Sequence, residues 1–171
     1  DYAGCRDTRK STSGGLIRFG GHLIRGWSST QKIIALSSGE AEYYGLVRGA
    51  VEAMGTKSIL ADMDVTVSLR TFEDSVVARG IATRTGLGKV RHLEVNQLWV
   101  QEKVRNGDLS ITRVKGLENL ADALTKNLDA DDLQKHIMGT NCEISTGRHP
   151  IMPTVTRELD DDEFDCLTDQ E

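Results

Sequence analysis

Two short β-prone apolar runs flank a pair of glycines near the beginning of the chain. The runs lie within residues 15–28, and Gly20 and Gly21 separate them. Adjacent glycines tolerate the positive φ angles that tight hairpin turns require. We therefore expect two antiparallel strands joined by a turn at Gly20 and Gly21.

A long helix is expected after this hairpin. Ser37 and Glu40 have the Ser-x-x-Glu spacing of a capping box, in which each side chain satisfies a free backbone N–H group at the helix start. Apolar residues then recur at the spacing of one helix face: Tyr43, Leu46, Val47, Ala50 and Met54. The pattern predicts an amphipathic helix of about five turns.

The remainder of the chain alternates between strand and helix signals. The expected elements are, in order, a strand over 65–70, a short helix from Ser75, a glycine-rich basic loop over 85–92, a helix ending near 106–107, a strand over 109–114 and a helix over 119–128 capped by Asn119. Strands and helices interleaved in this way indicate an α/β sheet covered by helices.

The size and charge distribution indicate one domain followed by a tail. The chain has 171 residues, of which 38% are hydrophobic, enough for one core of ordinary size. Residues 1–136 carry 19 Lys and Arg against 17 Asp and Glu, whereas residues 137–171 carry 2 against 9. We expect residues 1–136 to form the domain and the acidic residues 137–171 to form a disordered, solvated tail. A self-blocking segment that mimics nucleic acid is the alternative for the tail.

The cysteines and the hydropathy limit the class of protein further. Cys5, Cys142 and Cys166 are widely spaced without a C-x-x-C pair, which argues against a disulfide framework or a zinc site. No apolar run approaches the roughly 20 residues of a membrane span, and the first residues have no signal-peptide pattern. We expect a protein of a reducing compartment that is not secreted. Because the sequence starts at Asp1 and not at Met, we also expect a piece of a longer protein.

Four acidic residues lie where expected elements begin or end. Glu42 borders the apolar face of the long helix, and Asp74 follows a strand. Asp122 lies in the first turn of the last helix, and Asp1 begins the chain. Acids from different elements that meet at one sheet edge can bind two divalent cations. The structural alternatives are an N-cap role for Asp74 and a helix-dipole role for Asp122, while capping explains Glu40.

Five segments of the chain form an ordered series of motifs. They are DYAGCRDTRKSTSG (1–14), WSSTQK (27–32), LSSGEAEY (36–43), VRHLEV (90–95) and NLADALTK (119–126). The series resembles the ribonuclease H domain of copia-type retrotransposon Pol polyproteins, which stands next to the reverse transcriptase. The resemblance extends from residue 1 to about residue 136, with the motifs in the family's order.

The resemblance implies a ribonuclease H-like fold, in which helices flank a mixed sheet, with the first, central strand largely missing from this chain. It implies endonucleolytic hydrolysis of RNA in RNA–DNA hybrids during reverse transcription, with two Mg²⁺ ions, for which Mn²⁺ can substitute. Glu42, Asp74 and Asp122 match the catalytic, metal-binding acids. Asp1 matches the second aspartate of the family's Ser-Asp-Ala-Asp opening, so the first, metal-bridging aspartate falls two residues upstream. Glu73 stands where the family has a small polar residue.

A basic stretch follows Asp74 and is expected to contact the nucleic-acid backbone. Its cationic residues are Arg79, Arg84, Lys89, Arg91 and His92. A solvated helix face and loop is the alternative for this stretch. The resemblance implies an RNA–DNA hybrid and the reverse transcriptase domain of the same polyprotein as partners, no membrane, and a cytoplasmic retroelement particle as the location.

Two other functions stay open at the level of sequence. The chain can be a catalytically inactive fragment or relic that packs on the polymerase or holds nucleic acid without cutting it. An integrase or transposase core shares the fold and the acidic triad, but the KSTSG and ADALTK segments match the ribonuclease pattern. The upstream position of the bridging aspartate predicts that the chain cleaves a hybrid only when it is extended by a strand's length, roughly 6 to 10 residues.

Overall fold

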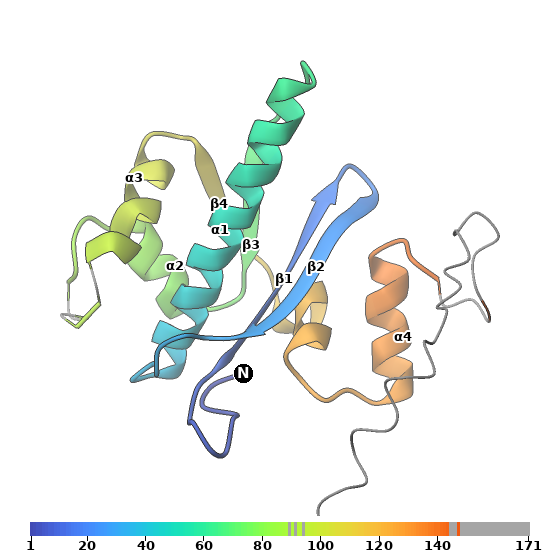
Figure 1. Ribbon diagram of the computed structural model, residues 1–171, viewed down its shortest axis with the longest axis horizontal. Coiled ribbons are helices and arrows are strands. Elements are labelled where there is room, and N and C mark those ends of the chain that lie inside the picture. Colours follow the sequence, from blue (N-terminus) through green and yellow to red (C-terminus); the bar gives the residue numbers. More distant parts are fainter. Residues whose placement is uncertain (89, 91, 94, 144–146, 148–171) are drawn as a thin grey trace, which may run out of the picture.

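The computed structural model describes residues 1–88, 90, 92–93, 95–143 and 147, and shows a mixed α/β protein (Figure 1). Its helices and strands are β1 (Thr12–Phe19), β2 (His22–Thr30), α1 (Ser38–Asp62), β3 (Leu69–Glu73), α2 (Val76–Thr83), α3 (Trp99–Arg105), β4 (Leu109–Arg113) and α4 (Ala130–Gly139). Three short 3₁₀ helices are η1 (Val95–Leu98), η2 (Gly116–Glu118) and η3 (Leu120–Leu124). The order of strands and helices is the one expected from the sequence.

The first two strands form the expected antiparallel hairpin. Pairing runs from Thr12 with Thr30 to Phe19 with His22, and Gly20 in the turn has a φ of +58°. Gln31, directly after the hairpin, donates 2.8 Å hydrogen bonds from its side-chain amide to Ser13 Oγ and to the backbone oxygen of Ala41. The hairpin is therefore tied to the first turn of α1.

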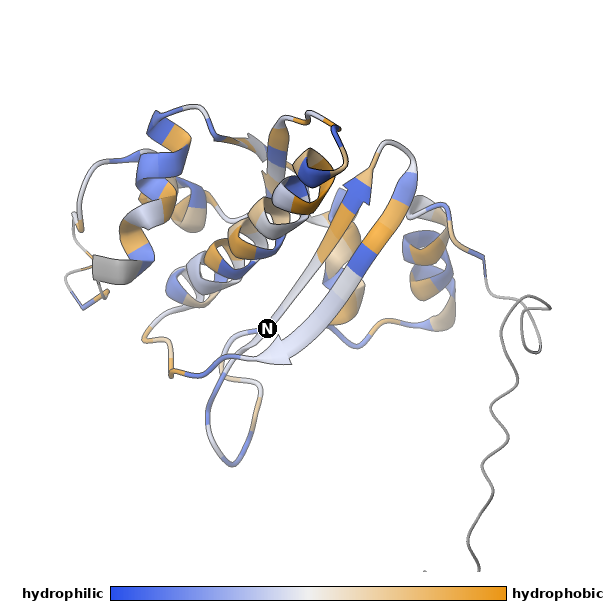
Figure 2. Ribbon diagram, turned by 45° about the horizontal axis from the view of Figure 1, so that its top comes forward, coloured by the Kyte–Doolittle hydropathy of each residue, from blue (hydrophilic) through white to orange (hydrophobic). Residues whose placement is uncertain are grey.

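The long helix α1 carries the core and is longer than expected. Its 25 residues begin after Ser37, whose hydroxyl accepts a hydrogen bond from Glu40 N as the capping pattern predicts. Asp64, at a φ of +60°, lies just after the helix ends. Figure 2 shows apolar and polar residues alternating along α1. The buried core contains Tyr43, Leu46, Val47, Ala50, Ala78, Ile81, Ala82, Leu93, Val100 and Leu109.

The second pair of strands is parallel and begins later than expected. Pairing runs from Leu69 with Leu109 to Glu73 with Arg113. The prediction of a strand over 65–70 is wrong except at its last two residues, Leu69 and Arg70. Val65 N donates to Leu60 O and continues the turn that closes α1, so only the residues from Leu69 onward find a partner strand.

The last expected helix forms only as the short η3, and the helix α4 that follows it was not expected. The prediction of one helix over 119–128 is wrong, because η3 stops at Leu124 and Asp129 starts α4 by accepting a 2.8 Å hydrogen bond from Asp132 N. Helix α4 crosses the expected domain end at residue 136. Beyond it, Asn141 Nδ2 donates a 2.7 Å hydrogen bond to Gly21 O. Most of the expected tail, residues 144–146 and 148–171, lies outside the described residues.

A cleft separates the two pairs of strands. It has a volume of about 570 Å³ and is lined by consecutive residues of β1 and of β3. On the α1 side it is lined by Glu42, Gly45, Leu46, Gly49 and Ala53. Strand β1 lies between β2 and β3 in Figure 1, so each strand pair turns one unpaired edge toward the cleft.

Asp1 occupies one end of this cleft and pairs with β1. Its amino group donates a 2.9 Å hydrogen bond to Thr12 O, and Thr12 N donates to Asp1 O at 3.3 Å and to Asp1 Oδ1 at 2.8 Å. Two residues that exchange both backbone hydrogen bonds form an antiparallel pair. In the part of the chain that the structure describes, no helix has the length and apolar character needed to cross a membrane.

Candidate metal centre and nucleic-acid surface

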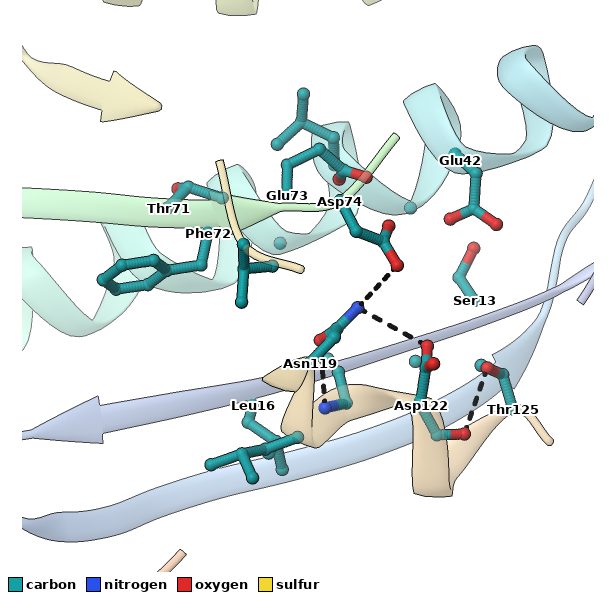
Figure 3. Close-up of a pocket in the computed structure, with 18 of the residues that line it drawn as sticks. Ser13, Leu16, Glu42, Thr71, Phe72, Glu73, Asp74, Asn119, Asp122 and Thr125 are labelled. Atoms are coloured by element: carbon teal, nitrogen blue, oxygen red, sulfur yellow. Dashed lines mark hydrogen bonds between the residues drawn. The ribbon is translucent and has the colours of Figure 1, made fainter. Parts of the chain in front are cut away.

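Acidic side chains from three elements meet at the Asp1 end of the cleft. Glu42 comes from α1, Asp74 directly follows β3 and Asp122 lies on η3. Figure 3 shows the carboxylates of these three residues pointing toward a common space, with the Ser13 hydroxyl beside Glu42. The structure therefore brings Glu42 and Asp74 close enough to hold one ion together, and it places Asp122 on the wall of the same cleft but outside that group.

Glu73 adds a fourth carboxylate to this group. One ligand atom from each of Glu42, Glu73 and Asp74 can be chosen so that all lie within 4.8 Å of one another. Glu73 is the last residue of β3 and is only 9% exposed. Its Oε1 accepts a 3.0 Å hydrogen bond from Ser75 N. The sequence marked Glu73 only as a departure from the family, although its place beside Asp74 was a usable signal.

The local structure decides between the alternative roles of Asp74. Ser75 is the N-cap of α2, and its hydroxyl accepts a 3.1 Å hydrogen bond from Ala78 N. Because the cap position is filled by Ser75, the N-cap interpretation of Asp74 is wrong. The carboxylate of Asp74 instead accepts a hydrogen bond from the Asn119 side chain across the cleft.

Asn119 contacts both Asp74 and Asp122, and Lys126 pairs with Asp122. Asn119 Oδ1 accepts a 3.2 Å hydrogen bond from Ala121 N, the expected capping contact. Its Nδ2 donates to Asp74 Oδ2 at 3.4 Å and to Asp122 Oδ1 at 3.5 Å. Lys126 Nζ lies 2.6 Å from Asp122 Oδ2. The sequence analysis gave Asn119 only a capping role and missed Lys126, whose four-residue spacing from Asp122 was a signal for an ion pair.

The crowding of negative charge changes the acidity of these groups. The protein atoms packed around Glu42 raise the pKa of its carboxyl, and Asp74 and Asp122 raise it further, against the lowering effect of the amino terminus and Lys126. Burial raises the pKa of Glu73 to about 8, with further contributions from Glu42 and Asp74. A divalent cation would stabilise the ionised forms of both groups.

The donor set fits a hard divalent cation. All the gathered ligand atoms are carboxylate oxygens, which Mg²⁺ and Mn²⁺ prefer, and no cysteine or histidine belongs to the group among the described residues. Lys126 already supplies one positive charge to the group. These residues therefore fit the magnesium chemistry that the motif series implies.

Asp1 lies near the acids but its side chain is directed elsewhere. Its carboxylate accepts a hydrogen bond from Thr12 N, and Asp1 is not among the three residues that can hold a metal ion together. The Asp1 carboxylate is therefore tied to β1 and lies outside the group of acids that can hold one ion.

The basic residues after Asp74 lie in different environments. Arg84 is partly buried, and its guanidinium donates hydrogen bonds to the backbone oxygens of Gly86 (3.3 Å) and Leu87. Arg79, on α2, has a buried Nε with no hydrogen-bond partner among the described residues. His92 is exposed and pairs with Glu40. The expected contacts of Lys89 and Arg91 lie outside the described residues.

Comparisons with known proteins agree with the relation to retrotransposons. The chain is 31% identical over 143 residues to the retrovirus-related Pol polyprotein from transposon TNT 1-94 of Nicotiana tabacum, which covers 81% of this chain and 11% of that protein. It is 28% identical over 137 residues to the corresponding polyprotein from transposon RE1 of Arabidopsis thaliana, covering 78% and 9%. For transposon RE2 of Arabidopsis thaliana the identity is 29% over 131 residues, covering 75% and 9%.

These matches relate the chain to Pol polyproteins and do not identify one domain within them. The chain is distantly similar to retrotransposon Pol polyproteins and spans about a tenth of the length of these relatives. No protein-family model matches the chain, and no solved structure matches it significantly.

Proposed function

We propose that the chain is the ribonuclease H domain of a copia-type retrotransposon Pol polyprotein and that it hydrolyses the RNA strand of RNA–DNA hybrids. One observation carries the proposal: Glu42, Asp74 and Asp122, far apart in the sequence, meet at one end of a cleft. These are the three acids that the motif series matches to catalytic positions, and the similarity to Pol polyproteins supports that series.

Glu42, Asp74 and Asp122 would hold two Mg²⁺ ions, with Mn²⁺ as a substitute. When bound, the metal pair supplies an activated water and stabilises the leaving 3′ oxygen. Asn119 orients two of the acids by donating to both carboxylates, and Lys126 fixes the orientation of Asp122. Burial raises the pKa of Glu73 to about 8, and a bound cation would favour its ionised form, so Glu73 would add a carboxylate beside these acids.

The ribonuclease H-like fold that we propose contains one more strand, in the cleft between β1 and β3. The Asp1–Thr12 pair supports this, because an antiparallel strand continued before Asp1 would run along Ser13, Gly14 and Gly15, which line the cleft. The second residue before Asp1 would then lie opposite Gly14, next to the acids. An aspartate at that position would bridge the metals, as the family pattern implies.

The proposed partners follow from the polyprotein context and from charge. An RNA–DNA hybrid presents a line of phosphates, which Arg79 and the loop around His92 would contact. The reverse transcriptase domain of the same polyprotein is the proposed protein partner, within a cytoplasmic retroelement particle.

Single substitutions of the acids test the proposal. In a chain that carries the upstream strand, Glu42→Gln, Asp74→Asn and Asp122→Asn should each reduce Mg²⁺-dependent cleavage of hybrid RNA by about a hundredfold or more. Glu118→Gln is the matched control, since Glu118 lines the same cleft and is exposed, as Glu42 is, but matches no catalytic position of the motif series. Equal activity in Glu42→Gln and Glu118→Gln would refute the proposal.

A second candidate is nucleic-acid binding without cleavage. The position of Asp1 favours it, because the Asp1 carboxylate accepts a hydrogen bond from Thr12 N and lies outside the group of acids that can hold one ion. One assay distinguishes the two candidates. If the strand-extended chain binds the hybrid and does not cleave it, the second candidate is supported.

A further inference from the structure

Glu40 is a buried carboxylate that takes no part in the proposed metal binding. It lies two residues before Glu42 on α1, and two residues rotate about 200° around a helix, so the two side chains point in nearly opposite directions. Glu40 is only 2% exposed. An ionised carboxylate loses several kcal/mol of hydration when it is buried, unless partners compensate for it. Its burial therefore needs more than a capping role.

The partners of Glu40 come from both sides of the helix start. Oε2 accepts a 2.9 Å hydrogen bond from Leu36 N and lies 2.7 Å from His92 Nε2, and Oε1 accepts a 2.8 Å hydrogen bond from Tyr44 Oη. Burial raises the pKa of Glu40, but the hydrogen bonds from His92, Leu36 and Tyr44 outweigh it and lower the pKa overall. The Glu40 carboxylate thus connects α1 to a residue 52 positions later in the chain.

His92 lies near the end of the basic loop that follows α2, and this loop is fixed at its other end too. Gln101 Oε1 accepts a 2.9 Å hydrogen bond from Gly86 N, and Gln101 Nε2 donates to Gly86 O at 3.0 Å. Leu93, next to His92, is buried in the core. The loop is therefore anchored by Gln101 at its start and by Glu40 at its end.

The imidazole of His92 is held at one nitrogen and open at the other. Its side chain is 44% exposed, and Nδ1 has no hydrogen-bond partner within the described part of the chain. The carboxylate at Nε2 fixes the orientation of the ring, and in the protonated imidazole Nε2–H donates to Glu40 while Nδ1–H is a second donor. Such a donor suits a phosphate oxygen.

We propose that Glu40 is a positioning residue for nucleic-acid binding, which holds His92 and its loop against the start of α1 so that the exposed edge of the imidazole meets a backbone phosphate. This inference rests on the proposed function, because it requires a nucleic-acid ligand. It gives Glu40 a role distinct from that of Glu42, which faces the metal-binding acids.

The test is a double-mutant cycle on hybrid affinity without divalent metal, so that no strand is cut. Glu40→Gln and His92→Asn should each raise the Kd of a fluorescent RNA–DNA hybrid by about tenfold at low salt. The double variant should bind no more weakly than either single variant, because both changes remove one contact. Ser37→Ala is the matched control: it removes the cap on Glu40 N and lowers the melting temperature, with the Kd unchanged within about twofold.

Amide hydrogen exchange without ligand supplies a second readout. Glu40→Gln should accelerate exchange at Gly86, Leu87 and Val90, and Ser37→Ala should not. Additive effects on Kd, or an unchanged Kd in His92→Asn, would overturn the proposal, as would unchanged exchange in Glu40→Gln. If the parent chain binds no hybrid, the proposed function fails, whereas the exchange data still decide whether Glu40 holds the loop.

Discussion

The side-chain amide of Asn119 donates a 3.4 Å hydrogen bond to the carboxylate of Asp74 and so joins the start of η3 to the end of β3. The same amide donates to Asp122 at 3.5 Å. One neutral donor therefore lies between two carboxylates that would otherwise repel each other. This contact holds the two carboxylates in their arrangement, and a specific substitution can test it.

Asn119→Asp should destabilise the metal-free protein more than the metal-bound one. The new carboxylate keeps the capping contact to Ala121 N but replaces the shared donor with a negative charge, at a cost of about 1.5–3 kcal/mol. We expect a lower melting temperature without metal and a larger gain on adding Mg²⁺ than in the parent. Asn119→Ala is the control, since it loses the cap without adding charge. Equal gains in all three proteins would contradict this account.

Glu73 makes the stability of the metal-free protein depend on pH. Burial raises the pKa of Glu73 to about 8 from an ordinary value of 4.5, so between these values the folded state keeps a proton that the unfolded state has released. Stability should therefore fall as pH rises across this window, by an amount on the order of a few kcal/mol, and level off above it. Glu73→Gln should remove most of this slope in thermal unfolding. If the stability of Glu73→Gln still falls with pH across this window, other titratable groups cause the pH dependence.

The hairpin depends on the absence of a side chain at Gly15. A Cβ atom there would lie 2.1 Å from Cζ2 of the Trp27 ring, so Gly15→Ala requires the ring to move and should cost about 1–3 kcal/mol in urea unfolding. Gly55→Ala in α1 is the opposite case, because nothing lies within 4 Å of its Cβ position, and a gain of about 0.5–1 kcal/mol is expected. If Gly15→Ala leaves the free energy of unfolding unchanged, the Trp27 ring does not pack against β1 at this position.

The features predicted correctly from the sequence are those with local causes. The turn at Gly20 needs a positive φ, and the caps at Ser37 and Asn119 satisfy backbone N–H groups within three residues. Each of these depends only on neighbouring residues. The convergence of Glu42, Asp74 and Asp122 was reached through an ordered motif series, and not through spacing alone.

The features that could not be predicted depend on distant partners. The start of β3 at Leu69 is set by where β4 begins, and the break after η3 is set by Asp129 starting a new helix. The partner of Glu40 is His92, from another part of the chain. The capping box predicted the hydrogen bond from Glu40 N to Ser37 Oγ, but the Glu40 carboxylate accepts from Leu36 N, and the pattern gave no signal for His92.

Cleavage of an RNA–DNA hybrid tests the central claim most directly. The measurement compares the chain preceded by about eight further residues from its own coding sequence, a strand's length, with its Glu42→Gln variant in Mg²⁺. We expect the extended chain to cut the RNA strand and leave the DNA strand intact, and the variant to lose cleavage while still binding the hybrid. No cleavage of the RNA strand by the extended chain, or equal cleavage by the variant, would contradict the account.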